Sequence, residues 1–371
     1  MIVKELIKYL EDWAPPGAAW EKDNVGLQVG SGDETIKNIL LSLELTSEVL
    51  DEALKKNCNF IFTHHPLIFN PIKNLDVNKN HVSKLIYRLV KNDINLFSAH
   101  TNLDFTKDGV SFQLAKNLNL NNITFLKNEE SNQFKIVVFI PESNLDEVAS
   151  SMFNQGAGII GEYNSCSFRT NGIGTFKGSA NTNPFIGQKE NFEKVNEVRL
   201  EVLVDSWKLN KVINAMLNSH PYEEPAFDIY PLKNKNVNYG AGAIGELEKE
   251  MKVNEFLKHV ENSLELSNFR YSIGDKKVIK KVAVCGGAGS DLLNDAIAKN
   301  ADAFITADIK YHTFHDALNK ILLIDAGHYE TEIVVLKIVE EKIKKLIKEK
   351  KENIKVYKYS LSTNPVKFYK Q

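Results

Sequence analysis

The sequence contains little arginine, and its charges are balanced. Four of the 371 residues are arginine, and the 46 basic residues face 48 acidic ones, which gives a net charge of −2. Proteins that bind nucleic acid usually carry clustered arginine and a clear excess of positive charge. We therefore expect neither nucleic acid nor an anionic membrane surface among the partners of this protein.

Cysteine is also scarce, and long apolar runs are missing. The three cysteines, Cys58, Cys166 and Cys285, are far apart and form no C-x-x-C pair. This argues against a disulfide framework and against a cysteine-type zinc site. No apolar run approaches the length of a membrane span. The first 13 residues mix charged and apolar side chains, unlike the core of a signal peptide. These features predict a cytoplasmic protein.

Two adjacent histidines, His64 and His65, follow a short apolar run that predicts a buried strand, Phe60–Thr63. Pro66 then blocks helix continuation and favours an extended backbone at His65. Neighbouring side chains of an extended chain point to opposite sides. The pair is therefore poorly placed to chelate one ion and well placed to serve two neighbouring ions. The alternative is a pair of solvated loop histidines.

Two outer segments show alternating helix and strand signals. Before residue 128 the pattern predicts helices over Ile2–Asp12, Ser47–Lys56, His81–Asn92 and Val110–Leu118, and strands over Ile39–Leu43, Phe60–Thr63 and Ile94–Ala99. After residue 236 it predicts helices over Val253–Leu264, Asp291–Lys299 and Tyr329–Lys350, and strands over Val278–Cys285, Ala303–Thr306, Ile321–Asp325 and Ile354–Leu361. The fold class is therefore α/β, and the length suggests two or three domains.

The middle region, residues 128–236, has a different order of predicted elements, which matches a β-α-β-β-α-β sandwich. Strands are predicted over Phe134–Ile140, Asn196–Val204 and Ala226–Leu232, two more strands within Ser165–Lys177, and helices over Leu145–Gln155 and Trp207–Ser219. A loop is expected over Gly178–Asn191 and a linker over Lys233–Asn238. We expect a ferredoxin-like α+β domain inserted between the outer segments.

The outer segments contain an internal repeat. Ile36–Thr63 and Ile279–Thr306 align without gaps at an offset of 243, with eight identities in 28 positions. A His-x-x-x-acid pattern then follows a buried strand in each segment. The sequence therefore predicts two pseudo-symmetric α/β halves, residues 1–127 and 237–371, which form one core around a cleft. Ligands of open α/β sheets usually bind outside the carboxyl ends of the strands.

The residues at or just past these strand ends form a candidate metal site. The set consists of three imidazoles and two carboxylates: His64, His65, Asp104, His328 and Glu332. It suits two borderline divalent ions, zinc foremost, with iron or manganese as alternatives. Taken singly, Asp104 could be a turn carboxylate, and His328 and Glu332 could be a pair at a helix start. His100 occupies the place that corresponds to His328 and could instead orient a ligand, so we leave it out of the set.

Other polar motifs are weaker candidates. The segment His220–Pro225 is dense in polar groups but lies far along the inserted region. His312 and His315 follow a predicted strand end and could line the cleft, although solvated helix histidines are the commoner case. Gly286–Gly289 lies between a strand and a helix, where it is either a tight turn or a cradle for an anion.

Several motifs resemble those of a known family. Thr63–Pro66, Ser98–Asp104 and Gly327–Glu332, together with Asp23–Gly30 and Cys285–Ser290, resemble the GTP cyclohydrolase 1 type 2 homologues, also called the Nif-three-like family. The resemblance covers both outer segments. It implies a dinuclear site in which His64, Asp104 and Glu332 hold one metal and His65, His328 and Glu332 the other, in a toroidal homohexamer. The inserted region resembles the CutA-like, PII-related domain of the longer bacterial members, with His220–Asp228 as its hallmark.

The family name implies an activity and leaves alternatives open. By resemblance, the substrate is a small molecule such as a nucleotide, and GTP would give dihydroneopterin triphosphate and formate. A metal-dependent hydrolase is thus the first hypothesis, with no catalytic residue assigned. The second is a non-catalytic metal-binding or regulatory assembly in which the inserted domain acts as a sensor. The third is an adaptor that works through protein contacts.

Overall fold

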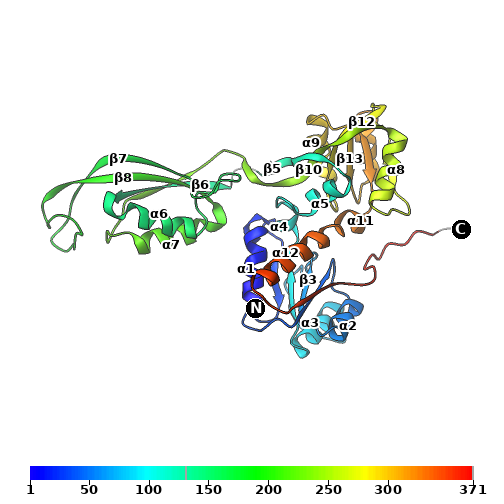
Figure 1. Cartoon of the computed structure of the whole chain (residues 1–371), viewed down its shortest axis with the longest axis horizontal. Helices are drawn as coiled ribbons and strands as arrows, with labels where there is room; N and C mark the ends of the chain where they lie inside the picture. The colour runs from blue at the N-terminus through cyan, green and yellow to red at the C-terminus, as the bar shows by residue number, and fades with distance from the viewer. Residues whose placement is uncertain (130–131, 370–371) are drawn as a thin grey trace. The chain divides into compact units, whose positions relative to one another are not determined.

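The computed structural model describes residues 1–129 and 132–369 and divides into two compact units (Figure 1). The larger unit combines Met1–Lys127 with Tyr239–Gln371, and the smaller one is Asn128–Asn238. The chain thus leaves the larger unit once and returns to it. In the described part of the chain, no helix is long and apolar enough to cross a membrane.

The first sheet of the larger unit belongs to the N-terminal segment and one C-terminal strand. Its order is β1 (Gly26–Val29), β4 (Asn95–Ser98), β3 (Phe60–Thr63), β2 (Asn38–Ser42) and β15 (Lys355–Lys358). Strands β15, β2, β3 and β4 run parallel, and β1 is antiparallel to β4. The carboxyl ends of the parallel strands therefore meet at one edge, where the loops after β3 and β4 lie close together.

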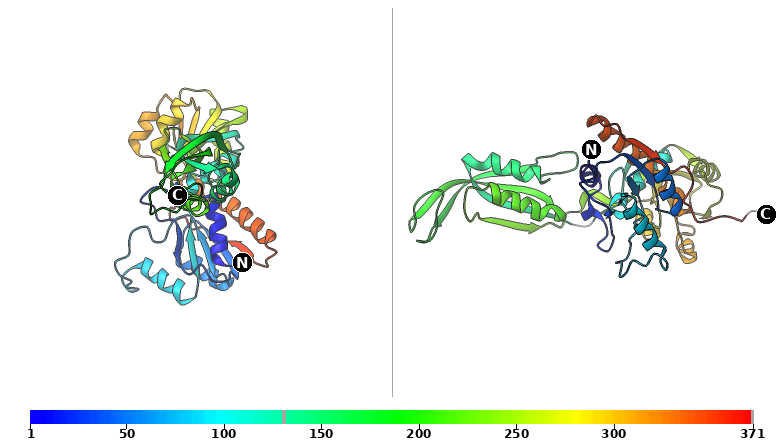
Figure 2. Two further views of the ribbon diagram at one scale, coloured as in Figure 1. Left: turned by 90° about the vertical axis from the view of Figure 1, so that its left-hand side faces the viewer. Right: turned by 90° about the horizontal axis from the view of Figure 1, so that it is seen from below.

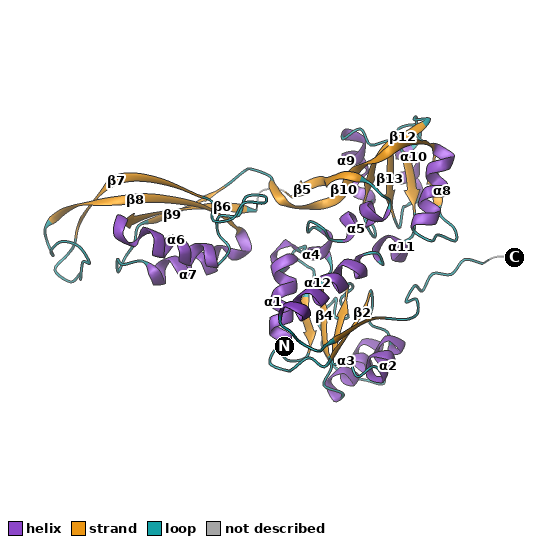
Figure 3. Cartoon of the chain, in the orientation of Figure 1, coloured by secondary structure: helices purple, strands orange, loops and turns teal. Residues whose placement is uncertain are grey.

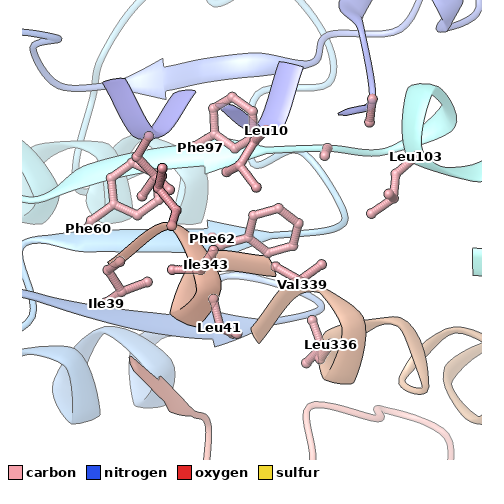
Figure 4. Close-up of a cluster of buried hydrophobic side chains, with 14 of the residues drawn as sticks. Leu10, Ile39, Leu41, Phe60, Phe62, Phe97, Leu103, Leu336, Val339 and Ile343 are labelled. Atoms are coloured by element: carbon pink, nitrogen blue, oxygen red, sulfur yellow. The ribbon is translucent and has the colours of Figure 1, made fainter. Parts of the chain in front are cut away.

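Both faces of this sheet are covered, which explains its nearly continuous apolar strands. On one face Phe60, Phe62 and Phe97 pack with residues of α1 (Val3–Trp13) and α12 (Val335–Glu349), as Figure 4 shows. The intervening residues point the other way, toward α2 (Ser47–Lys55) and α3 (His81–Lys91). Figure 2 shows the N-terminus beside α12, where the Met1 amino group pairs with Glu352.

The second sheet of the larger unit has six strands. Its order is β11 (Arg270–Ser272), β14 (Leu322–Asp325), β13 (Ala303–Thr306), β12 (Val278–Val284), β10 (Asn236–Lys252) and β5 (Asn121–Glu129). Strands β12, β13 and β14 run parallel, and β11 is antiparallel to β14. Alternate residues of these strands enter two separate apolar clusters, one on each face. This sheet therefore also presents a parallel carboxyl edge.

The remaining helices of the larger unit connect these strands. They are α4 (Thr101–Asp104), α5 (Val110–Asn117), α8 (Val253–Ser263), α9 (Leu293–Ala298), α10 (Tyr311–Ala317) and α11 (His328–Glu332), with short 3₁₀ turns at Pro16–Ala18 and Ser290–Leu292. The single helix expected over Tyr329–Lys350 is wrong, because α11 and α12 are separate. The break at Ile333–Val334 separates α11, which holds His328 and Glu332 just after β14, from the long helix α12.

The smaller unit contains one antiparallel sheet with helices against one face (Figure 3). Its chain order is β6 (Gln133–Pro141), α6 (Leu145–Asn154), β7 (Ser167–Lys177), β8 (Phe192–Asp205), α7 (Leu209–Ser219) and β9 (Phe227–Pro231), with 3₁₀ turns at Glu142–Asn144 and Ser206–Lys208. The spatial order of the strands is β7, β8, β6, β9. This is the β-α-β-β-α-β order of a ferredoxin-like sandwich.

The prediction of two strands within Ser165–Lys177 is wrong, because β7 is one strand paired along its length with β8. Gly174 lies within this strand and allows a side chain of β8 to approach closely. A Cβ built there would lie 1.9 Å from an oxygen of the Glu197 carboxylate on β8. The expected linker over Lys233–Asn238 also ends early, because β10 begins at Asn236.

We predict that Phe62→Ala destabilises the protein by about 3–5 kcal/mol, because Phe62 is fully buried in one cluster with Phe60 and Phe97. Phe69→Ala is the matched control, since Phe69 is 57% exposed and should change the free energy of unfolding by less than about 0.5 kcal/mol. Urea unfolding followed by circular dichroism measures both. Equal effects of the two variants would contradict the assignment of this core.

Candidate metal centre

The candidate site lies where strands of both sheets end. His64 and His65 directly follow β3, and the backbone N–H groups of both donate to the carbonyl of Leu43, at 3.0 and 2.8 Å. Asp104 ends the single-turn helix α4, which follows β4. His328 and Glu332 are the first and last residues of α11, which follows β14. Short helices at strand ends thus supply three of the five predicted residues.

Each imidazole near the site is held through its Nδ1 atom. The partners are the Ala99 carbonyl for His64 (2.8 Å), Glu44 for His65 (3.0 Å), Asp23 for His100 (2.9 Å) and Asp308 for His328 (2.6 Å). A carbonyl or a carboxylate oxygen can only accept, so Nδ1 carries the proton in the neutral ring. The lone pair of Nε2 is then free to bind a metal, the usual arrangement behind metal-binding histidines.

The Glu332 carboxylate lies at the centre of the cluster. One oxygen is 3.0 Å from Nε2 of His328 and 3.8 Å from Nε2 of His64, and the other is 3.1 Å from Nε2 of His65. The residue is 3% exposed. A carboxylate buried to this extent needs opposite charges around it. Glu332 is therefore placed to be shared between neighbouring groups.

Asp104 joins the cluster through His64. Its Oδ1 atom lies 3.6 Å from Nε2 of His64, which is too far for a hydrogen bond. His64 Nε2 and Asp104 Oδ1 are shielded from solvent and form no hydrogen bond with any described residue. Glu332 Oε2 is shielded as well and has Nε2 of His65 as its neighbour at 3.1 Å. Buried polar atoms are rarely left without a partner. Shielded donor atoms that face one another in this way fit a site that holds cations.

The electrostatics of the cluster favour imidazolium–carboxylate pairing when no metal is bound. Burial alone would lower the pKa of His65, but hydrogen bonds with Glu332 and Glu44 raise it to about 10. The hydrogen bond with Glu332 likewise raises the pKa of His328 to about 9, against the effect of burial. Burial raises the pKa of Asp104. A metal would take the place of these protons, since it binds neutral imidazole and ionised carboxylate.

The glycine turn after β12 makes room for Glu332. Gly287 has φ +62°, and a Cβ built on it would lie 2.2 Å from a Glu332 carboxylate oxygen. The N–H groups of Gly286, Gly287 and Gly289 donate to side-chain hydroxyls at 3.3, 3.0 and 2.9 Å. These three N–H groups are already engaged, so few donors of the turn remain for an anion. The turn instead gives Glu332 the space that it needs.

The other candidate histidines do not join the cluster. His220 is buried, with Nε2 bonded to the Phe139 carbonyl at 3.0 Å and Nδ1 accepting from the Tyr222 N–H at 3.1 Å. Both of its nitrogens are therefore used within the smaller unit. His312 and His315 lie on α10 and are exposed, in ring contact with Tyr311 rather than with the cluster.

His100, which we left out of the predicted set, lies beside the cluster. Its ring is 5.3 Å from that of His64 and 5.4 Å from that of His65, centre to centre. Ligand atoms of His64, His65 and His100 lie within 4.8 Å of one another, as do those of His65, His328 and Glu332. The structure thus brings His100 close enough to contribute a nitrogen.

Sequence reasoning missed the carboxylates that orient two of these rings. Glu44 follows β2 and holds His65, and it also accepts a hydrogen bond from Thr363 in the C-terminal segment. Asp308 follows β13 and holds His328. Both lie two residues past a parallel strand, so the strand-end rule that found the histidines would also have found them.

The fold and this cluster define a class of protein: a mixed α/β protein with histidines and carboxylates gathered at strand ends. Comparison with known families is specific. The sequence model of the family described as Duf34/NIF3 (NGG1p interacting factor 3) matches residues 1–365. The chain belongs to this family, which confirms the resemblance seen in the motifs.

Relatives and solved structures match over nearly the whole chain. Proteins named GTP cyclohydrolase 1 type 2 homolog from Halalkalibacterium halodurans and Bacillus subtilis are 38% and 37% identical over 365 and 368 residues, each match covering 98% of both chains. A Bacillus cereus protein described as related to NIF3 aligns with TM-score 0.83 and 37% identity, covering 100% of this chain and 99% of its own. A Staphylococcus aureus structure aligns with TM-score 0.78, 30% identity and the same coverage.

We predict that Gly287→Ala lowers the affinity of the cluster for zinc at least about tenfold, the scale seen when the groups supporting metal ligands are disturbed. The new methyl group would meet the Glu332 carboxylate. Gly161→Ala is the control, because Gly161 also has a positive φ, +57°, but no atom lies within 4 Å of the added Cβ. Both variants carry backbone strain of about 1–2 kcal/mol. Titration with zinc and a competing chelator measures the affinity, and an unchanged value in Gly287→Ala would contradict this role.

Proposed function

We propose that the cluster holds two divalent metal ions and that the protein is a metal-dependent hydrolase. His64, Asp104 and Glu332 would hold one ion, and His65, His328 and Glu332 the other. The observation that carries the proposal is the buried Glu332 carboxylate with three imidazole Nε2 atoms within 3.8 Å of it. The buried atoms His64 Nε2 and Asp104 Oδ1, which form no hydrogen bond with any described residue, support the same interpretation.

The donor set suits zinc, with iron or manganese as alternatives. Imidazole nitrogen and carboxylate oxygen bind all three metals. The set contains no cysteine thiolate, the ligand that would select zinc most strongly over manganese. Paired divalent ions supply a water with a lowered pKa and stabilise negative charge that develops on the substrate. The chain itself would fix the ligands, since each Nδ1 contact sets the tautomer and the direction of its ring.

GTP is the first substrate to test. Relatives that are 37–38% identical over nearly the whole chain are named as homologues of GTP cyclohydrolase 1 type 2. On this proposal GTP and one water give formate and dihydroneopterin triphosphate: the guanine imidazole ring is opened by hydrolysis, and its carbon between the two nitrogens leaves as formate. The metal-binding cluster would thus carry out a hydrolysis of this class. No residue is assigned as general acid or general base.

We further propose that the larger unit consists of two related halves. Strands β2, β3 and β4 run parallel with β1 antiparallel to β4, and β12, β13 and β14 run parallel with β11 antiparallel to β14. This equivalence agrees with the sequence repeat. We also propose that the smaller unit is a CutA-like, PII-related insertion, and that the protein works in the cytoplasm as a toroidal homohexamer.

We predict that the two carboxylates affect metal content differently. Glu332→Gln should remove both ions, because Glu332 is near all three imidazoles, whereas Asp104→Asn should remove only the ion beside His64. Asp33→Asn is the control, since Asp33 is an exposed partner of Lys4. Metal analysis of purified protein by plasma mass spectrometry measures the ratio. The same loss in both site variants would argue against a shared Glu332.

We predict that metal-loaded protein releases formate from GTP and that His65→Ala reduces the rate at least about 100-fold, the scale of losing a metal-supported step. His81→Ala is the control, because His81 is exposed at the start of α3. Formate release and pterin fluorescence report the reaction. If metal-replete wild type releases neither product, GTP is not the substrate, and a non-catalytic metal-binding role becomes the better account.

A further inference from the structure

The smaller unit contains a cavity of about 600 Å³, and none of its lining residues belongs to the metal cluster. Its lining consists of most of β7 with the loop that follows it, a few residues of β6 and β8, and the turn Tyr222–Ala226 after α7. A volume of this size is typical of sites for small organic molecules. The polar motif His220–Pro225, which the metal chemistry leaves unused, thus forms part of a cavity.

Aromatic rings line this cavity. The Tyr222 ring has two phenylalanine rings of the lining as neighbours. Its centre lies 6.2 Å from that of Phe176 and 6.4 Å from that of Phe185, and the planes are inclined by 61° and 54°. His220 holds the turn by accepting the Tyr222 backbone N–H at 3.1 Å. Phe185 is 57% exposed, so one aromatic side chain at the mouth is available to a ligand.

The charges that face the cavity are mainly negative. Glu197, Glu223 and Glu224 contribute carboxylates, and Lys177 and Arg199 contribute cations. Arg199 is already paired with Glu201 at 3.1 Å. The carboxylate of the half-buried Glu197 lies against the backbone of Gly174, where a Cβ would approach to 1.9 Å. Because Gly174 has no side chain, the negatively charged Glu197 carboxylate can lie against β7 in the lining of the cavity.

The Tyr222 side chain lies beside the Glu197 carboxylate. The hydroxyl oxygen is shielded from solvent. Burial and then a hydrogen bond with Glu197 raise the pKa of the phenol, so it remains a neutral hydroxyl. The Glu197 carboxylate is therefore next to an aromatic residue of the cavity lining.

We propose that this cavity binds a small organic cation, an ammonium or quaternary ammonium group attached to an apolar body. Aromatic faces attract such cations through their quadrupole, and the Glu197 carboxylate adds opposite charge. An anion would meet three carboxylates and two cations, one of which, Arg199, is already paired with Glu201. A purely apolar ligand would desolvate the Glu197 carboxylate without gain. The proposal is independent of the metal centre and of its reaction.

The test is isothermal titration calorimetry of the full-length protein with benzyltrimethylammonium, and with benzyl alcohol and benzoate as neutral and anionic probes of similar shape. The expected result is saturable binding of the cation, at least about tenfold tighter than of either comparison probe. Glu197→Gln should weaken cation binding at least about fivefold. Phe185→Leu keeps an apolar side chain but removes the ring, so it should weaken the cation more than the alcohol.

Glu147→Gln and Tyr163→Phe are the matched controls, because Glu147 and Tyr163 are exposed residues of the same unit outside the cavity lining. Both should bind the cation as wild type does. Absence of saturable cation binding overturns the proposal, and so does equal binding of cation and alcohol. The Phe185→Leu variant could also change the sedimentation of the protein without changing cation binding. That result would assign this face to contacts between copies of the chain and would likewise overturn the proposal.

Discussion

The buried Glu332 carboxylate is the group on which the arrangement of the larger unit's centre depends. A carboxylate that is 3% exposed is costly unless cations or donors surround it. His65 and His328 lie within 3.1 Å of its oxygens, and the Gly287 backbone approaches because it has no side chain. These neighbours come from the ends of β3, β12 and β14, so both sheets must be in place before the carboxylate is compensated.

The orientation of the imidazoles follows from contacts outside the cluster. Each Nδ1 atom is fixed by a carbonyl or a carboxylate, so the Nε2 atoms point inward without freedom to choose another tautomer. Side chains held in this way lose little entropy when a ligand arrives, which is the advantage of preorganisation. Asp308, with φ +54°, takes up a backbone conformation that only a few residue types tolerate and so directs its carboxylate at His328.

The parallel strands and the cluster were largely predictable from the sequence, because both depend on local pattern. The apolar run Phe60–Phe62 indicated a strand buried on both faces just before His64, and the run Ile321–Ile324 indicated another a few residues before His328. The i, i+4 spacing placed His328 and Glu332 on one face of a helix turn. The family motifs pointed to the same residues independently.

The contacts between distant segments were not predictable in the same way. Glu44 holds His65 because β2 lies beside β3 in the sheet. Thr363 donates to Glu44 because the C-terminal segment returns to this edge. Strands β5 and β10 escaped detection because their sequences carry no clear alternation. That Gly174 makes room for Glu197 was not predictable either, because Glu197 lies on the neighbouring strand β8 and far from Gly174 along the chain.

The most direct measurement of the central claim is anomalous diffraction from a crystal of the zinc-loaded protein, recorded on both sides of the zinc absorption edge. We expect two peaks, one on each side of the Glu332 carboxylate: one beside His64 and Asp104, and the other beside His65 and His328. A single peak away from Glu332, or no peak in protein that contains zinc by chemical analysis, would contradict it.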